Sequence, residues 1–279
     1  RSNGQDMAKR KTRIGIALGA GSARGWAHIG VLQALDQAGI APEVVCGTSI
    51  GALVGAVYAD DGLAGLERWV KALTWRKVMG YFDLTLSGGL LKGDRLFSDL
   101  RDSFLGKRIE DLRLPFSAVA TDLESGREVW LREGPVADAV RASIAMPGLF
   151  TPSLRGDQLL VDGALVNPVP VSLARAMDAD FVIASDLSSS VAGRYLREVE
   201  SRKARMPNVA EVITGSLGIM SVRISRSRMA GEPADAVIQP QLGQLGLLEY
   251  HRGAEAIAEG RAAAELMIPQ IRRMLQYAN

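Results

Sequence analysis

The stretch that most constrains the fold is PEVVCGTSIG, which occupies residues 42–51. Its first half is a short apolar run rich in valine, and such a run predicts a buried strand. Its second half is a tight turn, and an apolar helix follows it through Tyr58. Ser49 therefore lies where a strand passes into a helix, within the pentapeptide GTSIG of residues 47–51. This pentapeptide fits the G-x-S-x-G pattern of a nucleophilic serine.

Two glycines in this segment, which we call the nucleophile elbow, suit a catalytic role. A serine at so sharp a turn has a strained backbone, and small neighbours such as Gly47 and Gly51 avoid clashes there. The N-terminal end of the following helix would also favour negative charge developing at Ser49. The alternative is an ordinary tight turn in which Ser49 only caps the helix.

A second strand–turn–helix unit precedes the elbow. Residues 13–18 predict a buried strand, and residues 19–25 (GAGSARG) are a turn that we call the glycine-rich loop. An amphipathic helix then runs to Gly39, which is placed to end it. Two such units in succession indicate an α/β fold, with a mostly parallel central sheet and helices on both faces.

The glycine-rich loop is compatible with three kinds of anion site. A P-loop would need Gly-Lys where this chain has Gly25-Trp26, and a dinucleotide fingerprint would need glycine at Arg24. Both nucleotide sites, and with them a nucleotide-binding oxidoreductase, are therefore disfavoured. An oxyanion hole requires only backbone N–H donors on a loop of small residues, and this segment meets that need. A tight turn that serves packing alone is the remaining alternative.

Three residues could act as the base that a nucleophilic serine needs. His28 follows the glycine-rich loop, where a packed or capping histidine is expected. His251 would complete the order Ser…Asp…His of an α/β-hydrolase triad, although it starts the polar end of a helix. Asp162 ends an apolar strand and precedes Gly163, where active-site residues of α/β folds tend to emerge; a turn-forming Asp-Gly is the alternative. An aspartate would work best as a base if burial raised its proton affinity.

Three motifs taken in order resemble the patatin-like phospholipases, in particular the small stand-alone bacterial group. They are LGAGSARGWAHIGVL at residues 18–32, GTSIG at residues 47–51 and DGA at residues 162–164. The resemblance implies a patatin-like variant of the serine hydrolase folds and a Ser–Asp dyad without a catalytic histidine. In such a dyad, Ser49 is the nucleophile and Asp162 is the proton acceptor.

The resemblance also implies roles for the glycine-rich loop. The backbone around Ala20, Gly21 and Ser22 would form the oxyanion hole, and Arg24 matches the family's basic position. The supporting motif residues are Gly19, Arg24, Gly25, Gly47, Gly51 and Gly163. Many family members have an unbroken run of glycines where this chain has Ala20 and Ser22, so the turn is less permissive and activity or substrate range could differ.

The remaining sequence predicts one domain over residues 14–279, with a motif-bearing core at 14–177 and closing helices at 178–279. Residues 1–13 predict a disordered or tag-derived arm, of which Arg1–Asp6 resemble an expression remnant. We expect a helix from Asn167-Pro168 to Met177, an exposed segment at 188–207, and a helix end with a mobile loop at 73–91. Further strands are expected at residues 116–120, 128–131, 158–161 and 181–185, and further helices at 135–144, 208–229 and 249–275.

Composition narrows the function. A net charge of +2 argues against a dedicated nucleic-acid surface. One cysteine, Cys46, and two histidines provide neither a disulfide framework nor a zinc site, and we expect no metal or cofactor. No signal peptide and no apolar run of membrane-spanning length is present, so a cytoplasmic protein is expected, with peripheral contact at the inner face of the membrane as an option. The apolar residues 75–91 could line an acyl-chain channel, touch a membrane or belong to the core.

The sequence therefore predicts a carboxylic-ester hydrolase acting on lipid acyl chains, of phospholipase A or lysophospholipase type. The rival hypothesis is a degenerate patatin-like protein that mainly binds a regulatory partner. The presence of both Ser49 and Asp162 counts against that rival.

Overall fold

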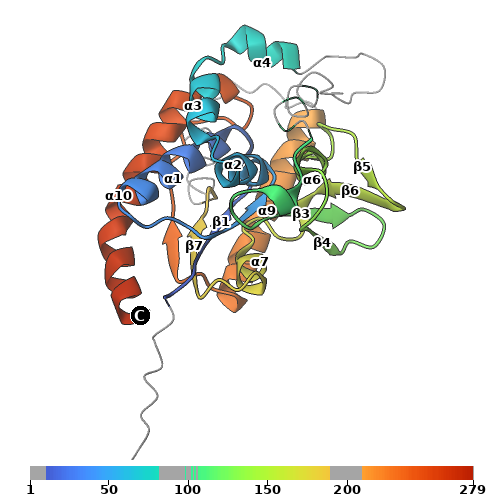
Figure 1. The fold of residues 1–279 in the computed structure, drawn as a ribbon. Coiled ribbons are helices and arrows are strands. Elements are labelled where there is room, and N and C mark those ends of the chain that lie inside the picture. Colours follow the sequence, from blue (N-terminus) through green and yellow to red (C-terminus); the bar gives the residue numbers. More distant parts are fainter. Residues whose placement is uncertain are drawn as a thin grey trace, which may run out of the picture.

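The computed structural model describes residues 11–81, 98, 102, 104, 106–188 and 209–278. Their centre is a sheet with the strand order β5-β6-β3-β2-β1-β7-β8, in which β4 also pairs with β3 (Figure 1). The strands are β1 (Ile14–Leu18), β2 (Val44–Thr48), β3 (Phe116–Asp122), β4 (Glu128–Leu131), β5 (Ser153–Arg155), β6 (Gln158–Asp162), β7 (Phe181–Ser185) and β8 (Ala236–Ile238). The pairs between β3, β2, β1, β7 and β8 are parallel, whereas those that β4, β5 and β6 make are antiparallel. The predicted mostly parallel sheet is confirmed.

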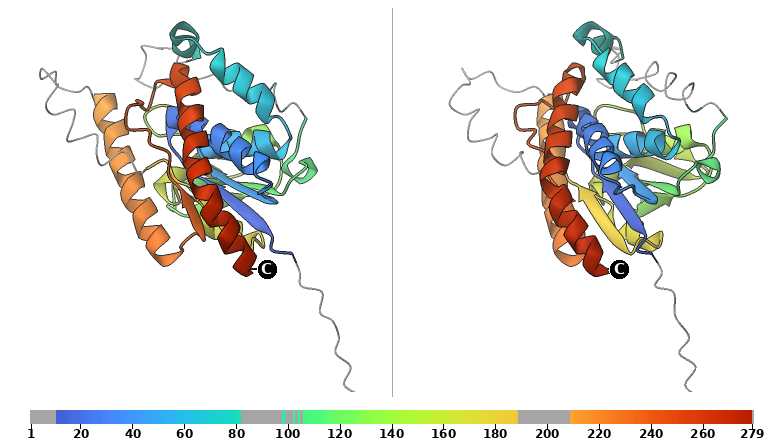
Figure 2. Two further views of the ribbon diagram at one scale, coloured as in Figure 1. Left: turned by 90° about the vertical axis from the view of Figure 1, so that its left-hand side faces the viewer. Right: turned by 60° about the vertical axis from the view of Figure 1, so that its left-hand side comes forward.

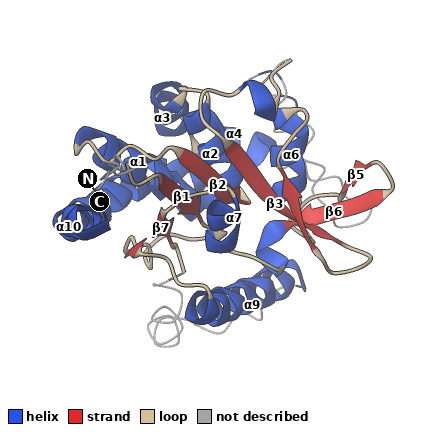
Figure 3. Cartoon of the chain, turned by 60° about the horizontal axis from the view of Figure 1, so that its bottom comes forward, coloured by secondary structure: helices blue, strands red, loops and turns tan. Residues whose placement is uncertain are grey.

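Helices cover both faces of this sheet (Figures 2 and 3). Figure 3 shows α1, α2 and α6 on one side of the strands and α9 on the other. The described α-helices are α1 (Ala27–Gln37), α2 (Ile50–Ala59), α3 (Leu63–Lys71), α4 (Trp75–Tyr81), α6 (Val136–Ser143), α7 (Val171–Ala176), α9 (Val209–Gly231) and α10 (Gly253–Ala278).

Successive side chains of the central strands point to opposite faces of the sheet, and they pack into two separate cores. In β1, Ile16 and Leu18 belong to the larger core that contains α1, α2 and α10. Ala17 and Cys46 belong to a second core that contains α7. Both sides of β1 and β2 are thus buried, and for this reason these strands read as continuous apolar runs rather than as alternating ones.

Small residues bring α10 against α1. A Cβ atom on Gly30 would lie 1.9 Å from the carbonyl oxygen of Ile257, and one on Gly260 would lie 1.9 Å from that of Ala27. The two helices can therefore approach this closely only because both positions are glycine. This contact ties the end of the chain to the helix that follows the glycine-rich loop, and it sets where the segment before α10 reaches the site.

Most of the expected elements are present, with three omissions and one correction. The strands β5 and β8 and the helix α3 were not predicted. The helix expected from Asn167-Pro168 begins only at Val171, after Pro170. The side chain of Asn167 does not cap it and instead donates to Glu128 Oε1 and Ser172 Oγ.

Some expectations fall outside the described residues: most of the N-terminal arm, residues 82–91 of the mobile loop, and nearly all of the segment 188–207. Within the described part of the chain, no helix is long and apolar enough to cross a membrane.

Candidate active site

The nucleophile elbow joins β2 to α2 and holds Ser49 in a strained conformation, with φ 58° and ψ −125°. Its glycines allow the chain to pass very close to itself. A Cβ atom on Gly47 would lie 2.3 Å from the Gly51 carbonyl oxygen, and one on Gly51 would lie 2.2 Å from that of Leu18. The tight strand-to-helix turn predicted from GTSIG is present, and the N-terminal end of α2 begins directly after Ser49.

Ser49 and Asp162 lie within hydrogen-bonding distance, with 2.6 Å between Ser49 Oγ and Asp162 Oδ2. The sheet register explains how they meet. Thr48, at the end of β2, is paired with Val119 of β3, and the next residue of β3, Ala120, is paired with Asp162. Because β6 pairs only with the part of β3 that extends beyond β2, the last residue of this antiparallel strand arrives beside the serine.

The environment of Asp162 makes its carboxylate a stronger proton acceptor. The residue is 1% exposed, and burial raises its pKa to about 6, against the lowering effect of the Ser49 bond and of the Ala164 N–H at 2.8 Å from Oδ1. Gly163 permits this close approach, since a Cβ atom there would lie 2.3 Å from the Val119 carbonyl oxygen. A carboxylate with a pKa near 6 remains ionised at neutral pH and is a better base than an exposed aspartate.

Ser143, at the end of α6, is a site residue that sequence reasoning missed. Its hydroxyl donates to the Val119 carbonyl oxygen at 2.6 Å and accepts from the Ser49 N–H at 2.9 Å. It therefore fixes the backbone of the elbow to β3. The sequence gives little signal for this role, because Ser143 lies late in an amphipathic helix and no motif surrounds it.

The amides of the glycine-rich loop divide into two groups. Gly19 N–H donates to the Ser185 carbonyl oxygen at 3.0 Å, and Ala20 N–H donates to that of Pro168 at 2.9 Å. The Ala20 amide is therefore engaged and not free to bind an oxyanion in this structure. The amides of Gly21 and Ser22 donate to no acceptor in the described part of the chain.

His28 holds the start of the loop. Its Nε2 lies 2.7 Å from the Gly19 carbonyl oxygen and its Nδ1 lies 2.9 Å from Ser185 Oγ. A carbonyl can only accept, so Nε2 carries the proton and Nδ1 accepts from the serine. Burial lowers the pKa of His28 to about 4, so the ring is neutral at physiological pH. The predicted packed histidine thus has a defined contact, which positions the loop.

Two further motif residues of the loop, Arg24 and Gly25, hold it against neighbouring segments. Arg24 is 3% exposed and its Nε donates to the Leu245 carbonyl oxygen at 2.9 Å. Gly25 leaves room for Ile50, whose Cγ2 would lie 2.1 Å from a Cβ atom at this position. Arg24 thus links the loop to the segment before α10, and Gly25 lets the loop pack on the start of α2.

Neither histidine among the described residues forms a hydrogen bond to Ser49 or Asp162. His28 is occupied by Gly19 and Ser185, and the Nδ1 atom of His251 is buried without a partner. The carboxylate of Asp162 accepts from Ser49 and Ala164. The geometry offers the serine a carboxylate as its neighbouring base and no imidazole.

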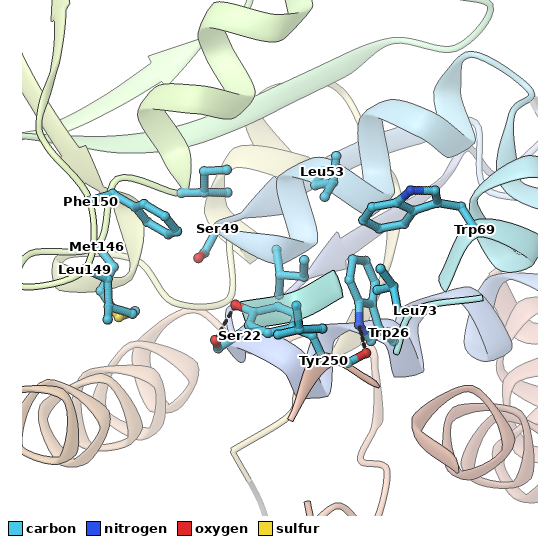
Figure 4. Close-up of a pocket in the computed structure, with 13 residues that line it drawn as sticks. Ser22, Trp26, Ser49, Leu53, Trp69, Leu73, Met146, Leu149, Phe150 and Tyr250 are labelled. Atoms are coloured by element: carbon cyan, nitrogen blue, oxygen red, sulfur yellow. Dashed lines mark hydrogen bonds between the residues drawn. The ribbon is translucent and has the colours of Figure 1, made fainter. Parts of the chain in front are cut away.

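An apolar pocket opens beside Ser49 (Figure 4). About 770 Å³ of space, part of it open to solvent, lies in the pocket and in front of it. Phe150 and Met146 line one side, and Leu53, Trp69 and Leu73 line the other. Its polar lining is confined to a few groups, which include the hydroxyls of Ser49 and Ser22 and that of Tyr250. Such a pocket suits a hydrocarbon chain whose reactive end lies at the serine.

Comparison with known proteins identifies the family. The sequence model of the family described as patatin-like phospholipase matches residues 16–175. An uncharacterized NTE family protein of Mycobacterium tuberculosis is 32% identical over 324 aligned positions, which cover 90% of each chain. The chain belongs to the patatin-like phospholipase family. The resemblance seen in the three motifs is thereby confirmed, and membership supports hydrolysis of lipid esters as the general activity.

Two further comparisons are with a longer relative and with a solved structure. Human patatin-like phospholipase domain-containing protein 6 is 36% identical over 184 positions, which cover 63% of this chain and 13% of that protein. The crystal structure of VipD from Legionella pneumophila superposes with a TM-score of 0.57 at 14% identity, covering 94% of this chain and 67% of VipD. The second likeness concerns the fold alone, and it supports the α/β architecture.

Proposed function

We propose that this patatin-like protein is a serine acyl hydrolase of phospholipase A or lysophospholipase type that works through a Ser49–Asp162 dyad. The observation that carries the proposal is the 2.6 Å hydrogen bond from Ser49 Oγ, which lines an apolar pocket, to the buried Asp162 carboxylate. The same contact favours an enzyme over a degenerate binding protein, because a buried carboxylate with a raised pKa beside a serine hydroxyl is the arrangement that a proton acceptor needs.

In the proposed acylation step, Ser49 Oγ attacks the ester carbonyl carbon while its proton passes to Asp162. The tetrahedral oxyanion accepts hydrogen bonds from the Gly21 and Ser22 amides. As the intermediate collapses, the C–O bond to the alcohol breaks and Asp162 returns the proton to the leaving oxygen. Water then attacks the acyl-serine, Asp162 takes its proton, and Ser49 regains a proton as the fatty acid leaves.

The strained backbone at Ser49 and the start of α2 support this mechanism. The elbow presents the hydroxyl to the pocket, and the positive end of the helix dipole favours negative charge near Ser49. The acyl chain would occupy the apolar side of the pocket between Phe150 and Trp69.

Labelling with a fluorophosphonate tests the proposal. The probe should modify Ser49, as mapped by peptide mass spectrometry, and Ser49→Ala should remain unlabelled. Asp162→Asn should slow labelling by about a thousandfold because the serine loses its base, whereas His251→Ala should label like the parent. Modification of another serine, or a large loss in His251→Ala alone, would contradict the dyad.

Substrate type is tested separately. Purified protein should release fatty acid from phospholipid or lysophospholipid, with Ser49→Ala as the blank. A protein that cleaves neither short nor long acyl esters and is as inert as Ser49→Ala would favour the binding-protein hypothesis.

We also propose that this protein is cytoplasmic and makes peripheral contact with the inner face of a membrane. Trp75 on α4 is 61% exposed, and its neighbours Arg76 and Lys77 are exposed cations. Aromatic and basic side chains together favour a surface of anionic lipid. Trp75→Ala should reduce co-sedimentation with vesicles that contain phosphatidylglycerol, and unchanged sedimentation would contradict this contact.

A further inference from the structure

Ser22, in the middle of the glycine-rich loop, has an unusual backbone for a residue with a side chain. Its φ of 51° lies in the left-handed region, which glycine adopts far more readily than serine. This torsion sets the direction of the Ser22 N–H relative to the chain that follows, and that N–H is one of the two loop amides without an acceptor in the described residues. Something other than local preference must therefore hold it.

The side chain of Ser22 supplies that constraint. Its Oγ lies 2.6 Å from the hydroxyl of Tyr250, a residue 228 positions away in the sequence (Figure 4). No other hydrogen bond to Ser22 Oγ occurs within the described part of the chain. The bond thus joins the strained residue to the segment that precedes α10.

Tyr250 is itself held by two contacts with Trp26. The indole N–H of Trp26 donates to the Tyr250 carbonyl oxygen at 3.3 Å, and the two rings pack edge to face with centroids 6.0 Å apart. Burial raises the pKa of Tyr250 to about 12, so its hydroxyl keeps its proton over the whole range in which the enzyme would work. A fixed ring with a permanent hydroxyl is suited to hold a neighbouring hydroxyl in one place.

We propose that Tyr250 is a positioning residue, whose hydroxyl holds Ser22 in its left-handed conformation so that the Gly21 and Ser22 amides face the oxyanion. This inference rests on the proposed function. In a loop of glycines the backbone needs no such support, so the Tyr250 hydroxyl offsets the presence of a side chain at position 22. Because the oxyanion forms only during reaction, the loss of the bond should reduce kcat and leave KM nearly unchanged.

A double-mutant cycle with a short-chain p-nitrophenyl ester tests the proposal. Tyr250→Phe keeps the ring in the pocket and removes the hydroxyl, so kcat should fall about tenfold while KM changes less than about twofold. In the Ser22→Gly background, where no hydroxyl remains to hold, adding Tyr250→Phe should change kcat by less than about twofold. Tyr277→Phe, on the exposed final turn of α10, is the matched control and should have no effect.

A second comparison does not require Tyr250 to be changed. Ser22→Ala keeps the side-chain strain and loses the bond, whereas Ser22→Gly removes both, so Ser22→Gly should be about tenfold faster than Ser22→Ala. If Tyr250→Phe does not fold, this pair of Ser22 variants still tests the proposed role of the bond to Tyr250.

The outcomes separate the two proposals. Equal losses from Tyr250→Phe in both backgrounds, or a change in KM alone, would show that Tyr250 only shapes the pocket and would overturn the positioning role. A Ser22→Ala variant as fast as Ser22→Gly would overturn that role as well. A parent protein that is inert and unlabelled at Ser49 would instead overturn the proposed function, and this inference with it.

Discussion

The nucleophile elbow and the glycine-rich loop both follow a parallel strand, but they are fixed in different ways. The elbow is fixed mainly by close main-chain contacts, since Gly47 and Gly51 lie so close to main-chain atoms that no side chain fits, and Ser143 adds one side-chain hydrogen bond. The loop is held by residues outside it: His28, which follows it closely in the chain, and Ser185 and Tyr250, which come from distant parts of the chain. Both motifs can be recognised in the sequence, but the distant partners that hold the loop can be identified only in the fold.

The largest effect in this comparison is expected at the elbow. Gly51→Ala should prevent folding or cost about 4 kcal/mol or more, because its Cβ would lie 2.2 Å from the Leu18 carbonyl oxygen, which cannot move aside. Gly218→Ala in α9, where nothing lies within 4 Å, is the matched control and should stabilise by about 1 kcal/mol. Urea unfolding measures both. Equal stability of the two variants would show that the elbow is not fixed by its backbone.

The second effect concerns the two buried titratable groups, Asp162 of the dyad and His28 of the loop. Asp162 has its pKa raised from 3.8 to about 6, so the folded state binds more protons and the protein loses stability as pH rises through this window. His28 has its pKa lowered from 6.5 to about 4, so the unfolded state binds more protons and stability is lost as pH falls. In the parent protein the two contributions oppose each other.

Asp162→Asn removes the contribution of Asp162, so the pH dependence of stability that remains should be that of His28. At pH 7.5 the variant should be inactive yet more stable than the parent by up to about 3 kcal/mol, the equivalent of a shift of about two pKa units. This advantage should disappear by pH 4. Urea unfolding at several pH values measures it, and a constant difference in stability between the two proteins across this range would contradict the assigned pKa of the aspartate.

The pH dependence of the rate gives a third, smaller test. Asp162 must be ionised to accept the serine proton, so kcat/KM should fall about tenfold for each pH unit below about 6. His28 is neutral above about pH 5, because its pKa is near 4, and it should therefore add no further change in kcat/KM above that pH. If the pH dependence of kcat/KM changed in His251→Ala, the base role would pass to that histidine.

The smallest expected effect is on stability, and it comes from the strained backbone at Ser49. Ser49→Gly should be more stable than Ser49→Ala by about 1 kcal/mol, the reverse of the usual order, because glycine adopts the φ of 58° without a steric penalty. Both variants lack the nucleophile, so thermal unfolding alone is compared. The usual order, with alanine more stable, would mean that the elbow is not strained.

The sequence by itself determined the α/β class, the nucleophile elbow and the pair of residues whose roles we propose. Periodic apolar runs and glycine spacing are local properties, and they predicted six of the strands, the turn at Ser49 and the strand end at Asp162. The GTSIG and DGA motifs could be read because each requires small residues beside the functional side chain.

Only the tertiary structure decided how these parts combine. The register of β6 on β3 brings Asp162 to Ser49, and no local pattern encodes the register of two strands so far apart in the chain. Likewise, engagement of the Ala20 amide by Pro168 and the contact between Ser22 and Tyr250 depend on elements that meet only after the sheet and α10 have assembled. Local geometry follows from neighbouring residues, whereas the site is formed by long-range packing.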